Sequence, residues 1–220
     1  VKVARDLSPE HMWTTYNGFG FGDATGPGFP GESAGVLRPW KLWKRVVHDT
    51  LSYGYGISGT SLQLAIAFGA RAVEGRRRDP TLGMGAANPP QSIVDPRVAR
   101  QVAAMLETGT GPEGTGKRAR VENYRVSGKT GTSRKSSGGG YKERRYIATF
   151  AGFAPSSDPR IVGVVMIDDP QAGEYFGGAV AGPLFSSVMT GALRLMDVPP
   201  DNYEILVAKN TARSAAGGGQ

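Results

Sequence analysis

The sequence Ser127-Gly-Lys-Thr-Gly-Thr-Ser-Arg-Lys135 lies inside a segment that we predict to be a β-strand. A glycine within a strand marks a place where a ligand or another backbone comes close, and Gly131 stands at the centre of this one. Thr130 and Thr132 are two residues apart, so their hydroxyls point to one face of the strand. Positive charge nearby comes from Lys129 and Arg134. Such an edge can pair with an extended peptide and hold its carboxylate, although an ordinary edge strand with Lys and Thr for solubility has the same pattern.

The second half of the chain has the pattern of a strand meander closed by a helix. The predicted strands are Tyr124 to Lys135, Tyr146 to Ala154 and Ile161 to Asp168. Their connections are short, which predicts antiparallel neighbours. The third strand is apolar from Ile161 to Ile167, so we expect it to be buried on both faces, with helices packed on the sheet. Pro183 is predicted to open a helix whose sheet-facing stripe is Leu184, Val188, Ala192 (or Leu193) and Leu195.

The first half combines short helices with irregular segments. Ser8-Pro9 is typical of a helix start, and the glycines that begin at Gly18 end that helix. No helical or strand period can be drawn through residues 23–35, and a loop of this length usually has a function or packs against a partner. A helix is predicted over Ser61 to Val73, and its expected apolar side is Leu62, Leu64, Ala65, Phe68 and Ala72. Another starts at Asp95-Pro96, with a stripe of Val98, Val102, Met105 and Leu106.

Length and composition limit the classes of protein to consider. A chain of 220 residues with 39% hydrophobic residues can form one globular domain with a proper core. It has no cysteine, which excludes disulfides and thiolate metal sites and fits a secreted protein. No apolar run is long enough for a membrane span, so we expect any anchor or export signal to lie outside these residues.

The net charge of +7 would suit nucleic acid, an anionic membrane surface or an acidic polymer. The basic residues are scattered, and only the cluster from Arg38 to Arg45 interleaves them with aromatic rings, those of Trp40 and Trp43, that could stack on bases. A moderate positive excess is more often a solvated surface, so we predict no nucleic-acid partner.

Phosphate-loop and metal motifs can be set aside. The segment Gly111 to Lys117 fits most of a phosphate-binding loop, but Arg118 stands where the metal-binding hydroxyl is needed. We interpret it as a loop. The two histidines, His11 and His48, are far apart and lack carboxylates at ligand spacing. We therefore expect no metal and no cofactor.

Longer motifs around the opening stretch give a family resemblance. Lys-Thr-Gly is the third signature of the active-site serine penicillin-recognising enzymes, and Lys129-Thr-Gly131 carries it. Other segments in the matching order are Gly28-Phe-Pro-Gly-Glu32, Tyr53-Gly-Tyr-Gly56, Leu62-Gln-Leu-Ala65, Phe150-Ala-Gly-Phe-Ala-Pro155, Asp168-Asp-Pro170 and Tyr175-Phe-Gly-Gly178. From about residue 1 to 203 the chain resembles the C-terminal part of the transpeptidase domain of class B, septal-type penicillin-binding proteins.

The resemblance implies a fold and a set of site residues. The fold is of the α/β (α+β) class, an antiparallel sheet with helices packed on it, as in penicillin-binding transpeptidases and serine β-lactamases, and is incomplete here. In that family Thr132 would donate its backbone N–H to the oxyanion hole, and Lys129 would supply field and hydrogen bonds. The substrate or drug would be bound by Thr130, Gly131, Arg134, Tyr146, Tyr175 and Phe176, and Tyr55 would approach the cleft.

The family's nucleophile is absent from these residues. Its serine and base lysine lie on a Ser-x-x-Lys motif followed by Ser-x-Asn, and neither pattern occurs in the sequence. Thr132 lies three residues before Lys135, but on a strand these two side chains point to opposite faces. We therefore expect a cleaved or truncated form that is inactive alone.

Further expectations complete the sequence-based hypothesis. Residues 1–206 would form the C-terminal portion of a transpeptidase domain, and residues 207–220 a disordered tail. The resemblance implies a peptidoglycan D,D-transpeptidase that cross-links stem peptides, is a β-lactam target, and is periplasmic and anchored to the inner membrane by a segment absent here. Its partners would be stem peptides, β-lactams, the missing N-terminal part of the domain and cell-division proteins. The alternatives are a serine β-lactamase-like hydrolase and a non-catalytic basic binding module.

Overall fold

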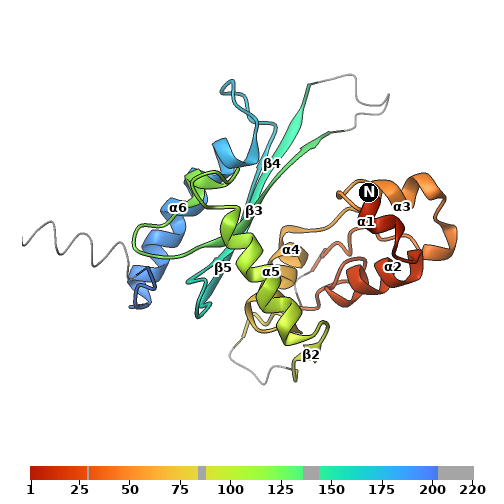
Figure 1. Cartoon of the computed structure of the whole chain (residues 1–220), viewed down its shortest axis with the longest axis horizontal. Helices are drawn as coiled ribbons and strands as arrows, with labels where there is room; N and C mark the ends of the chain where they lie inside the picture. The colour runs from red at the N-terminus through yellow and green to blue at the C-terminus, as the bar shows by residue number, and fades with distance from the viewer. Residues whose placement is uncertain (29, 84–87, 136–143, 203–220) are drawn as a thin grey trace, which may run out of the picture. The chain divides into compact units, whose positions relative to one another are not determined.

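The computed structural model describes residues 1–28, 30–83, 88–135 and 144–202 (Figure 1). The chain forms two compact units, Val1–Ala99 and Arg100–Gln220, and the boundary between them falls inside helix α5, Pro96–Thr108. The single domain portion expected over residues 1–206 stays a prediction. The predicted tail, 207–220, lies outside the described residues.

The first unit is mainly helical, and its helix starts follow the sequence signals. Ser8 accepts a hydrogen bond from the backbone N–H of His11 (3.1 Å) and caps α2, as predicted. Thr60 and Gln63 form a capping box at the start of α4, which agrees with the predicted helix over 61–73. The described elements are α1 Lys2–Arg5, α2 Pro9–Gly18, η1 Trp40–Leu42, α3 Arg45–Leu51, α4 Ser61–Ala72 and the antiparallel pair β1 Arg76–Arg77 and β2 Gln91–Ser92.

The buried face of α4 differs from the predicted one. The side that we expected to be buried includes Leu62, which is 37% exposed. The residues that are buried are Gln63, Ile66, Ala67 and Ala70. Small side chains let α4 approach its neighbours closely, and Ala67 and Ala70 pack with Phe19 in one apolar cluster. The predicted apolar stripe of this helix is therefore wrong.

A buried glutamine organises the irregular segment that follows α2. Gln63 is fully buried, and its amide nitrogen lies within hydrogen-bond distance of the carbonyl oxygens of Gly20 (3.1 Å), Asp23 (2.8 Å) and Ala34 (2.9 Å). Its amide oxygen accepts from the backbone N–H of Thr60 (2.8 Å). One side chain thus joins both ends of the loop at 23–35 to the start of α4. The loop therefore packs within its own unit.

The tip of the same loop is held by a carboxylate. Glu32 accepts hydrogen bonds from the hydroxyl and backbone N–H of Thr25 and from the backbone N–H of Gly26. These bonds, led by the Thr25 hydroxyl, hold the pKa of the Glu32 carboxyl below its ordinary value.

Replacing Gln63 with leucine tests this organisation. Gln63→Leu would leave buried carbonyl oxygens without their donor, so we expect the free energy of unfolding of the first unit to fall by about 2 to 3 kcal/mol. The measurement is urea denaturation followed by tryptophan fluorescence, because all three tryptophans, Trp13, Trp40 and Trp43, lie in this unit. Gln91→Leu, at an exposed position of β2 in the same unit, is the matched control. Equal effects of the two substitutions would contradict the assigned role.

The second unit contains the predicted meander. Its strands are β3 Ser127–Arg134, β4 Tyr146–Ala154 and β5 Ile161–Asp168, in the antiparallel order β3-β4-β5. The other described elements are the C-terminal part of α5, the 3-10 turn η2 Lys117–Ala119 and helix α6 Gly177–Leu195. The predicted strands and their antiparallel pairing are confirmed, except that β3 begins at Ser127 and not at Tyr124.

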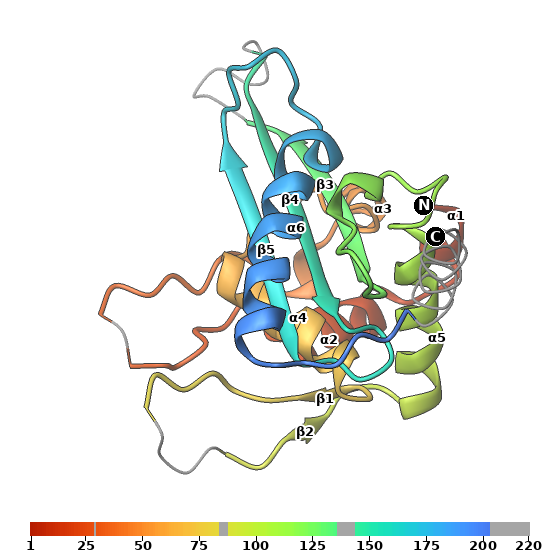
Figure 2. The same cartoon turned by 90° about the vertical axis from the view of Figure 1, so that its left-hand side faces the viewer.

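Helix α6 covers one face of the sheet (Figure 2), but with a different side from the one predicted. It buries Phe185, Met189 and Leu193, and the ring centroid of Phe185 lies 4.6 Å from that of Phe150 in β4. The predicted stripe is wrong at Leu184, Val188 and Leu195, which are exposed by 49%, 62% and 89%, and right only in its alternative member Leu193.

The start of α6 was also predicted wrongly. The helix begins at Gly177, and Pro183 lies inside it, where its ring removes one helical hydrogen bond. The close approach of Gly177 to two strands, described below, sets the start. The sequence signal of a proline at a helix start was misleading here.

The apolar sequence of β5 predicts burial on both faces, and this prediction is wrong. Ile161, Val165 and Ile167 pack against the core cluster beneath α6. No residue of β5 is fully buried, and Met166 on the other face is 55% exposed. Within the described ranges, β5 pairs with β4 alone, and its second edge has no strand partner.

Candidate active site

The Lys-Thr-Gly segment lies on the outer edge of the sheet. Within the part of the chain that the structure describes, β3 pairs only with β4, in an unbroken register from Ser127↔Phe153 to Arg134↔Tyr146. Because the register continues to its end, Thr130, Thr132 and Arg134 share one face of β3. The edge opposite β4 is left without a strand partner in the described ranges.

Each side chain of this segment has a defined partner. The Thr130 hydroxyl lies 2.9 Å from the hydroxyl of Thr115, in the loop before η2. The Thr132 hydroxyl accepts a hydrogen bond from the backbone N–H of Gly177 (3.0 Å). The ammonium group of Lys129 donates to the carbonyl oxygen of the next residue, Thr130 (3.0 Å). The two threonine hydroxyls are thus held in place by elements outside the strand.

Two glycines bring the N-terminus of α6 to this edge. A β-carbon on Gly177 would collide with the backbone oxygens of Gly131 and Thr149, and one on Gly178 would collide with the backbone oxygen of Thr115. Only glycine can therefore occupy these positions without moving the helix. The backbone N–H groups of a helix start carry partial positive charge, and that of Gly177 is bonded to the Thr132 hydroxyl.

A pocket of about 340 Å³ opens between these elements. It has cationic side chains, and the ammonium group of Lys129 lies close by, 3.4 Å from the Thr130 hydroxyl. Hydroxyls, cations and a helix N-terminus together suit a carboxylate ligand. The lining residues are Thr115, Lys117, Arg118, Thr130, Thr132, Phe176, Gly177, Gly178 and Ala179.

The predicted aromatic residues form one continuous stack. The rings of Tyr146 and Tyr175 are stacked with centroids 4.1 Å apart and planes 14° apart. Phe176 extends the stack, with its ring 4.5 Å from Tyr175, and is 59% exposed. Phe176 also lines the threonine pocket, so the stack leads directly away from it.

A second hollow of about 580 Å³ lies on the other side of the tyrosine pair. Arg134 lines it together with Tyr146 and Tyr175, so the three residues that the sequence placed near the site share one surface. Its remaining lining residues are Arg144, Pro170, Gln171, Gly173 and Glu174. Tyr55 belongs to the first unit, and the structure does not relate it to this site.

Sequence reasoning missed several lining residues. Thr115 and Lys117 line the pocket, whereas the sequence of their segment predicts no more than a loop. Gly177 and Gly178 were noted as part of a family motif, but no role was given to them. The signal that could have found them is a glycine pair before an apolar helix, which marks a helix N-terminus able to approach a strand.

The aromatic rings in the basic cluster at 38–45 have other contacts. The indole N–H of Trp43 donates to the carbonyl oxygen of Arg38 (2.8 Å), and its ring packs on the cluster formed by Ala4, Met12 and Leu51. The ammonium of Lys41 lies over the ring of Trp40, 5.6 Å from its centroid. Trp43 thus contributes to the core of the first unit.

Comparisons with known proteins now place this geometry in a family. The model of the penicillin-binding protein transpeptidase domain matches residues 1–190. The chain therefore belongs to the penicillin-binding protein transpeptidase family. A solved structure, the apo transpeptidase domain of Burkholderia pseudomallei penicillin-binding protein 3, is 45% identical with a TM-score of 0.84, over 91% of this chain and 61% of that one. The predicted family and fold are confirmed.

Two curated relatives show the same affiliation. The probable peptidoglycan D,D-transpeptidase PbpC of Pseudomonas aeruginosa is 40% identical over 207 residues, which are 92% of this chain and 36% of the relative. The peptidoglycan D,D-transpeptidase FtsI of Escherichia coli is 38% identical over 91% of this chain and 34% of the relative. The chain thus spans about a third of the length of these relatives. No described helix is both long and apolar enough to cross a membrane.

The two glycine positions of α6 allow a paired test. Gly177→Ala should push the helix start away from β3 and break its bond to Thr132, so we expect a loss of about 2 kcal/mol or more of stability, in the range of overpacked sites. Gly191→Ala, in the same helix with open space around it, should instead stabilise the helix by about 0.5 to 1 kcal/mol. Thermal unfolding by circular dichroism measures both. Shifts of the same sign would show that α6 does not depend on this close approach.

Proposed function

We propose that this chain carries one wall of the active site of a peptidoglycan D,D-transpeptidase that cross-links stem peptides in septal cell-wall synthesis. Its family and its D,D-transpeptidase relatives support this reaction. The observation that carries the proposal is the pocket in which the hydroxyls of Thr130 and Thr132 lie beside cations and the N-terminus of α6. A stem peptide ends in a carboxylate, which is the ligand that such a pocket suits.

In the proposed reaction a serine outside these residues attacks the D-Ala-D-Ala carbonyl carbon of a stem peptide. The terminal D-Ala leaves with its amine protonated, and an amine of a neighbouring stem then attacks the acyl-enzyme, which restores the serine. The backbone N–H of Thr132 would donate to the oxyanion, a contact that typically contributes about 2.7 to 4 kcal/mol in the transition state. Lys129 would supply positive field to the same region.

Substrate binding is assigned to the face of β3 and to the aromatic stack. The hydroxyls of Thr130 and Thr132 would donate hydrogen bonds to the terminal carboxylate, and Gly131 would let the peptide backbone approach. Tyr146, Tyr175 and Phe176 would line the side chain of a substrate or a β-lactam. Arg134 lies beyond the tyrosine pair and would attract an anionic substituent there.

The nucleophile would come from the remainder of the domain, which we propose as a partner of this chain. Apolar surfaces that call for such a partner include the α6 stripe with Leu184 and Val188, the α5 positions Val98 and Met105, and the open face of β5 with Met166. Each of these five side chains is exposed by 46% to 67%. By analogy with the named relatives, the complete protein would be a periplasmic cell-division enzyme anchored to the inner membrane.

Covalent labelling with a fluorescent penicillin tests the reaction. We expect no label on this chain alone, which has no Ser-x-x-Lys serine, and labelling of the complete domain on a serine outside these residues. A label on any residue of this chain would overturn the proposal. Hydrolytic turnover of the penicillin, in place of a persistent acyl-enzyme, would favour the β-lactamase alternative.

The role of Thr132 is tested by two substitutions in the complete domain. Thr132→Val removes the hydroxyl and keeps a β-branched side chain suited to a strand, so acylation should slow for β-lactams that bear a carboxylate. It also leaves the N–H of Gly177 without its acceptor, which Thr132→Ser would preserve. We expect Thr132→Ser to retain most of the acylation rate. A normal rate for Thr132→Val would exclude the carboxylate role.

The missing partner predicts a surface property. The chain alone should bind a hydrophobic fluorescent dye, because its apolar faces are uncovered, and added N-terminal remainder of the domain should abolish most of that signal. A chain that binds no dye would count against the proposed partner. An unrelated periplasmic domain serves as the control for non-specific displacement.

A further inference from the structure

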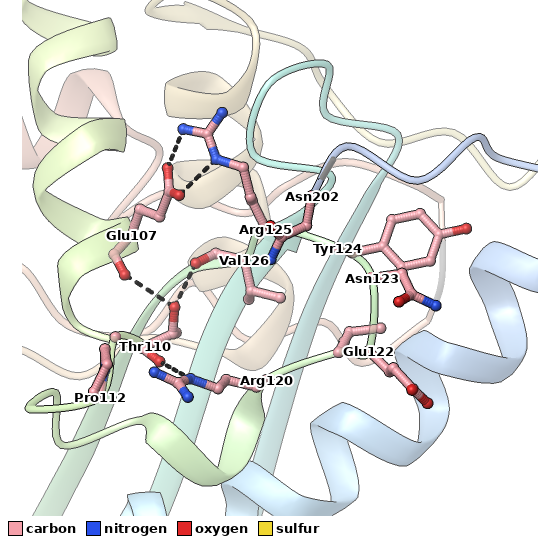
Figure 3. Close-up of a pocket in the computed structure, with 12 residues that line it drawn as sticks. Glu107, Thr110, Pro112, Arg120, Glu122, Asn123, Tyr124, Arg125, Val126 and Asn202 are labelled. Atoms are coloured by element: carbon pink, nitrogen blue, oxygen red, sulfur yellow. Dashed lines mark hydrogen bonds and ion pairs between the residues drawn. The ribbon is translucent and has the colours of Figure 1, made fainter. Parts of the chain in front are cut away.

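Polar side chains of α5 hold the point at which β3 begins. The Thr110 hydroxyl, just after α5, lies 2.6 Å from the carbonyl oxygen of Val126 and 3.0 Å from that of Glu107. Glu107 in turn forms a two-bond ion pair with Arg125, at 2.7 and 2.8 Å (Figure 3). Residues 125 and 126 immediately precede β3, so these bonds connect the end of α5 to the chain just before the first residue of the strand.

The first residue of β3 is also hydrogen-bonded to α5. Ser127 is fully buried, and its hydroxyl donates to the carbonyl oxygen of Ala103 in α5 (2.9 Å). The same hydroxyl lies 2.6 Å from that of Ser156, which lies 3.1 Å from a carboxylate oxygen of Glu107. The two serines therefore connect the strand start to the ion pair. We call Glu107, Thr110, Arg125 and Ser127 the anchor network.

The anchor network extends to the segment that follows α6. A carboxylate oxygen of Asp201 accepts from the backbone N–H of Arg125 (2.7 Å). The other accepts from the backbone N–H and the hydroxyl of Ser157 (3.1 and 2.8 Å), in the β4–β5 turn. This segment thus joins the start of β3 to the adjacent turn.

A pocket opens beside the anchor network, next to the residues that precede β3. The pocket has a volume of about 650 Å³, and Figure 3 shows the ion pair and the Thr110 bonds at its wall. Its lining residues are Glu107, Thr110, Gly111, Pro112, Arg120, Val121, Glu122, Asn123, Tyr124, Arg125, Val126 and Asn202. Val126 is 3% exposed and packs in the core cluster that contains Phe150, so the hydrogen bonds and the ion pair add to apolar packing at the strand start.

The position of β3 matters for the site because this strand carries the candidate site residues. In the described ranges β3 has one strand partner, and its other edge carries the candidate site. No second strand therefore fixes the position of β3 from that edge. Lys129 lies two residues after Ser127, which is about 7 Å along a strand. A displacement at Ser127 would therefore reach Thr130 and Thr132 with little attenuation.

We propose that the anchor network positions the catalytic edge of β3: it sets where Lys129, Thr130 and the backbone N–H of Thr132 lie without touching the substrate. Its members are positioning residues. The effect on catalysis rests on the proposed function, whereas the effect on the strand does not.

Acylation kinetics of the complete domain provide the first test. Glu107→Gln and Ser127→Ala should lower the acylation rate constant about tenfold to a hundredfold, the range expected for misplacement of about 1 Å, while the dissociation constant of the preceding non-covalent complex changes less. Glu113→Gln, an exposed carboxylate just after α5, makes the same charge change away from the network and should leave the rate unchanged. Equal rate constants in the three variants and the unchanged domain would overturn the proposal.

Hydrogen exchange separates positioning from general stability. In Ser127→Ala we expect amides of residues 129–132 to exchange at least about tenfold faster while those of β5 keep their protection, since local opening needs less free energy than global unfolding. Equal acceleration in β3 and β5 would mean that the network only stabilises the unit, and would reject the proposal. If Glu107→Gln does not fold, the smaller change Ser127→Ala decides.

The two proposals can fail separately. A complete domain that penicillin never labels would reject the proposed function, and exchange in the 220-residue chain would still decide whether the network fixes β3. Normal labelling with an unchanged exchange pattern would leave the function standing and reject the positioning role.

Discussion

The pairing of β3 with β4 is the constraint on which the rest of the site depends. A slip of one residue would turn the hydroxyls of Thr130 and Thr132 to the opposite face, because side chains alternate along a strand. The buried ring of Phe150 helps to exclude such a slip: a β-carbon on Gly128 or on Gly116 would collide with it. A strand shifted by one residue would place a side chain against that ring. The large core residue and the two glycines therefore specify one register.

Helix α6 serves the core and the site with different parts of its length. Its middle buries Phe185 and Met189 against the sheet, and this packing fixes the direction of the helix axis. Its first residues, Gly177 and Gly178, come so close to the strands that no side chain fits. Glycine weakens a helix by about 1 kcal/mol per position relative to alanine, so this start costs intrinsic helix stability. The packing of the middle offsets that cost and holds the N-terminus at Thr132.

The sequence predicted strands better than it predicted which faces are buried. The meander followed from β-branched and aromatic runs with short connections, and it agrees with the structure except at the start of β3. The stripes of α4 and α6 were misjudged because large apolar residues were taken as core. In both helices the closely packed side includes small residues, Ala70 and Ala181 among them, while Leu62 and Leu184 are partly exposed. The positions of large apolar residues do not predict the buried face of a helix where backbones approach closely or where apolar side chains stay exposed.

The candidate site was predicted in part for a related reason. Thr130 and Thr132 could be named because their motif is contiguous and specific, and the aromatic residues were named from the family resemblance. The contribution of Thr115 and Gly177 could not, because each reaches the strand from a separate segment and only the fold brings them together.

All described residues of both pockets at the site lie in the second unit, between Thr115 and Ala179. The wall that would hold a carboxylate is therefore formed within one compact unit, and its hydroxyls, helix N-terminus and aromatic stack are set by contacts inside that unit. A nucleophile would have to be supplied by another segment, since these 220 residues lack the Ser-x-x-Lys pattern. Recognition of the ligand and formation of the acyl bond would then belong to different parts of the polypeptide. Both steps would depend on the position of β3, because the carbonyl attacked by the serine would be held by the same strand that binds the carboxylate.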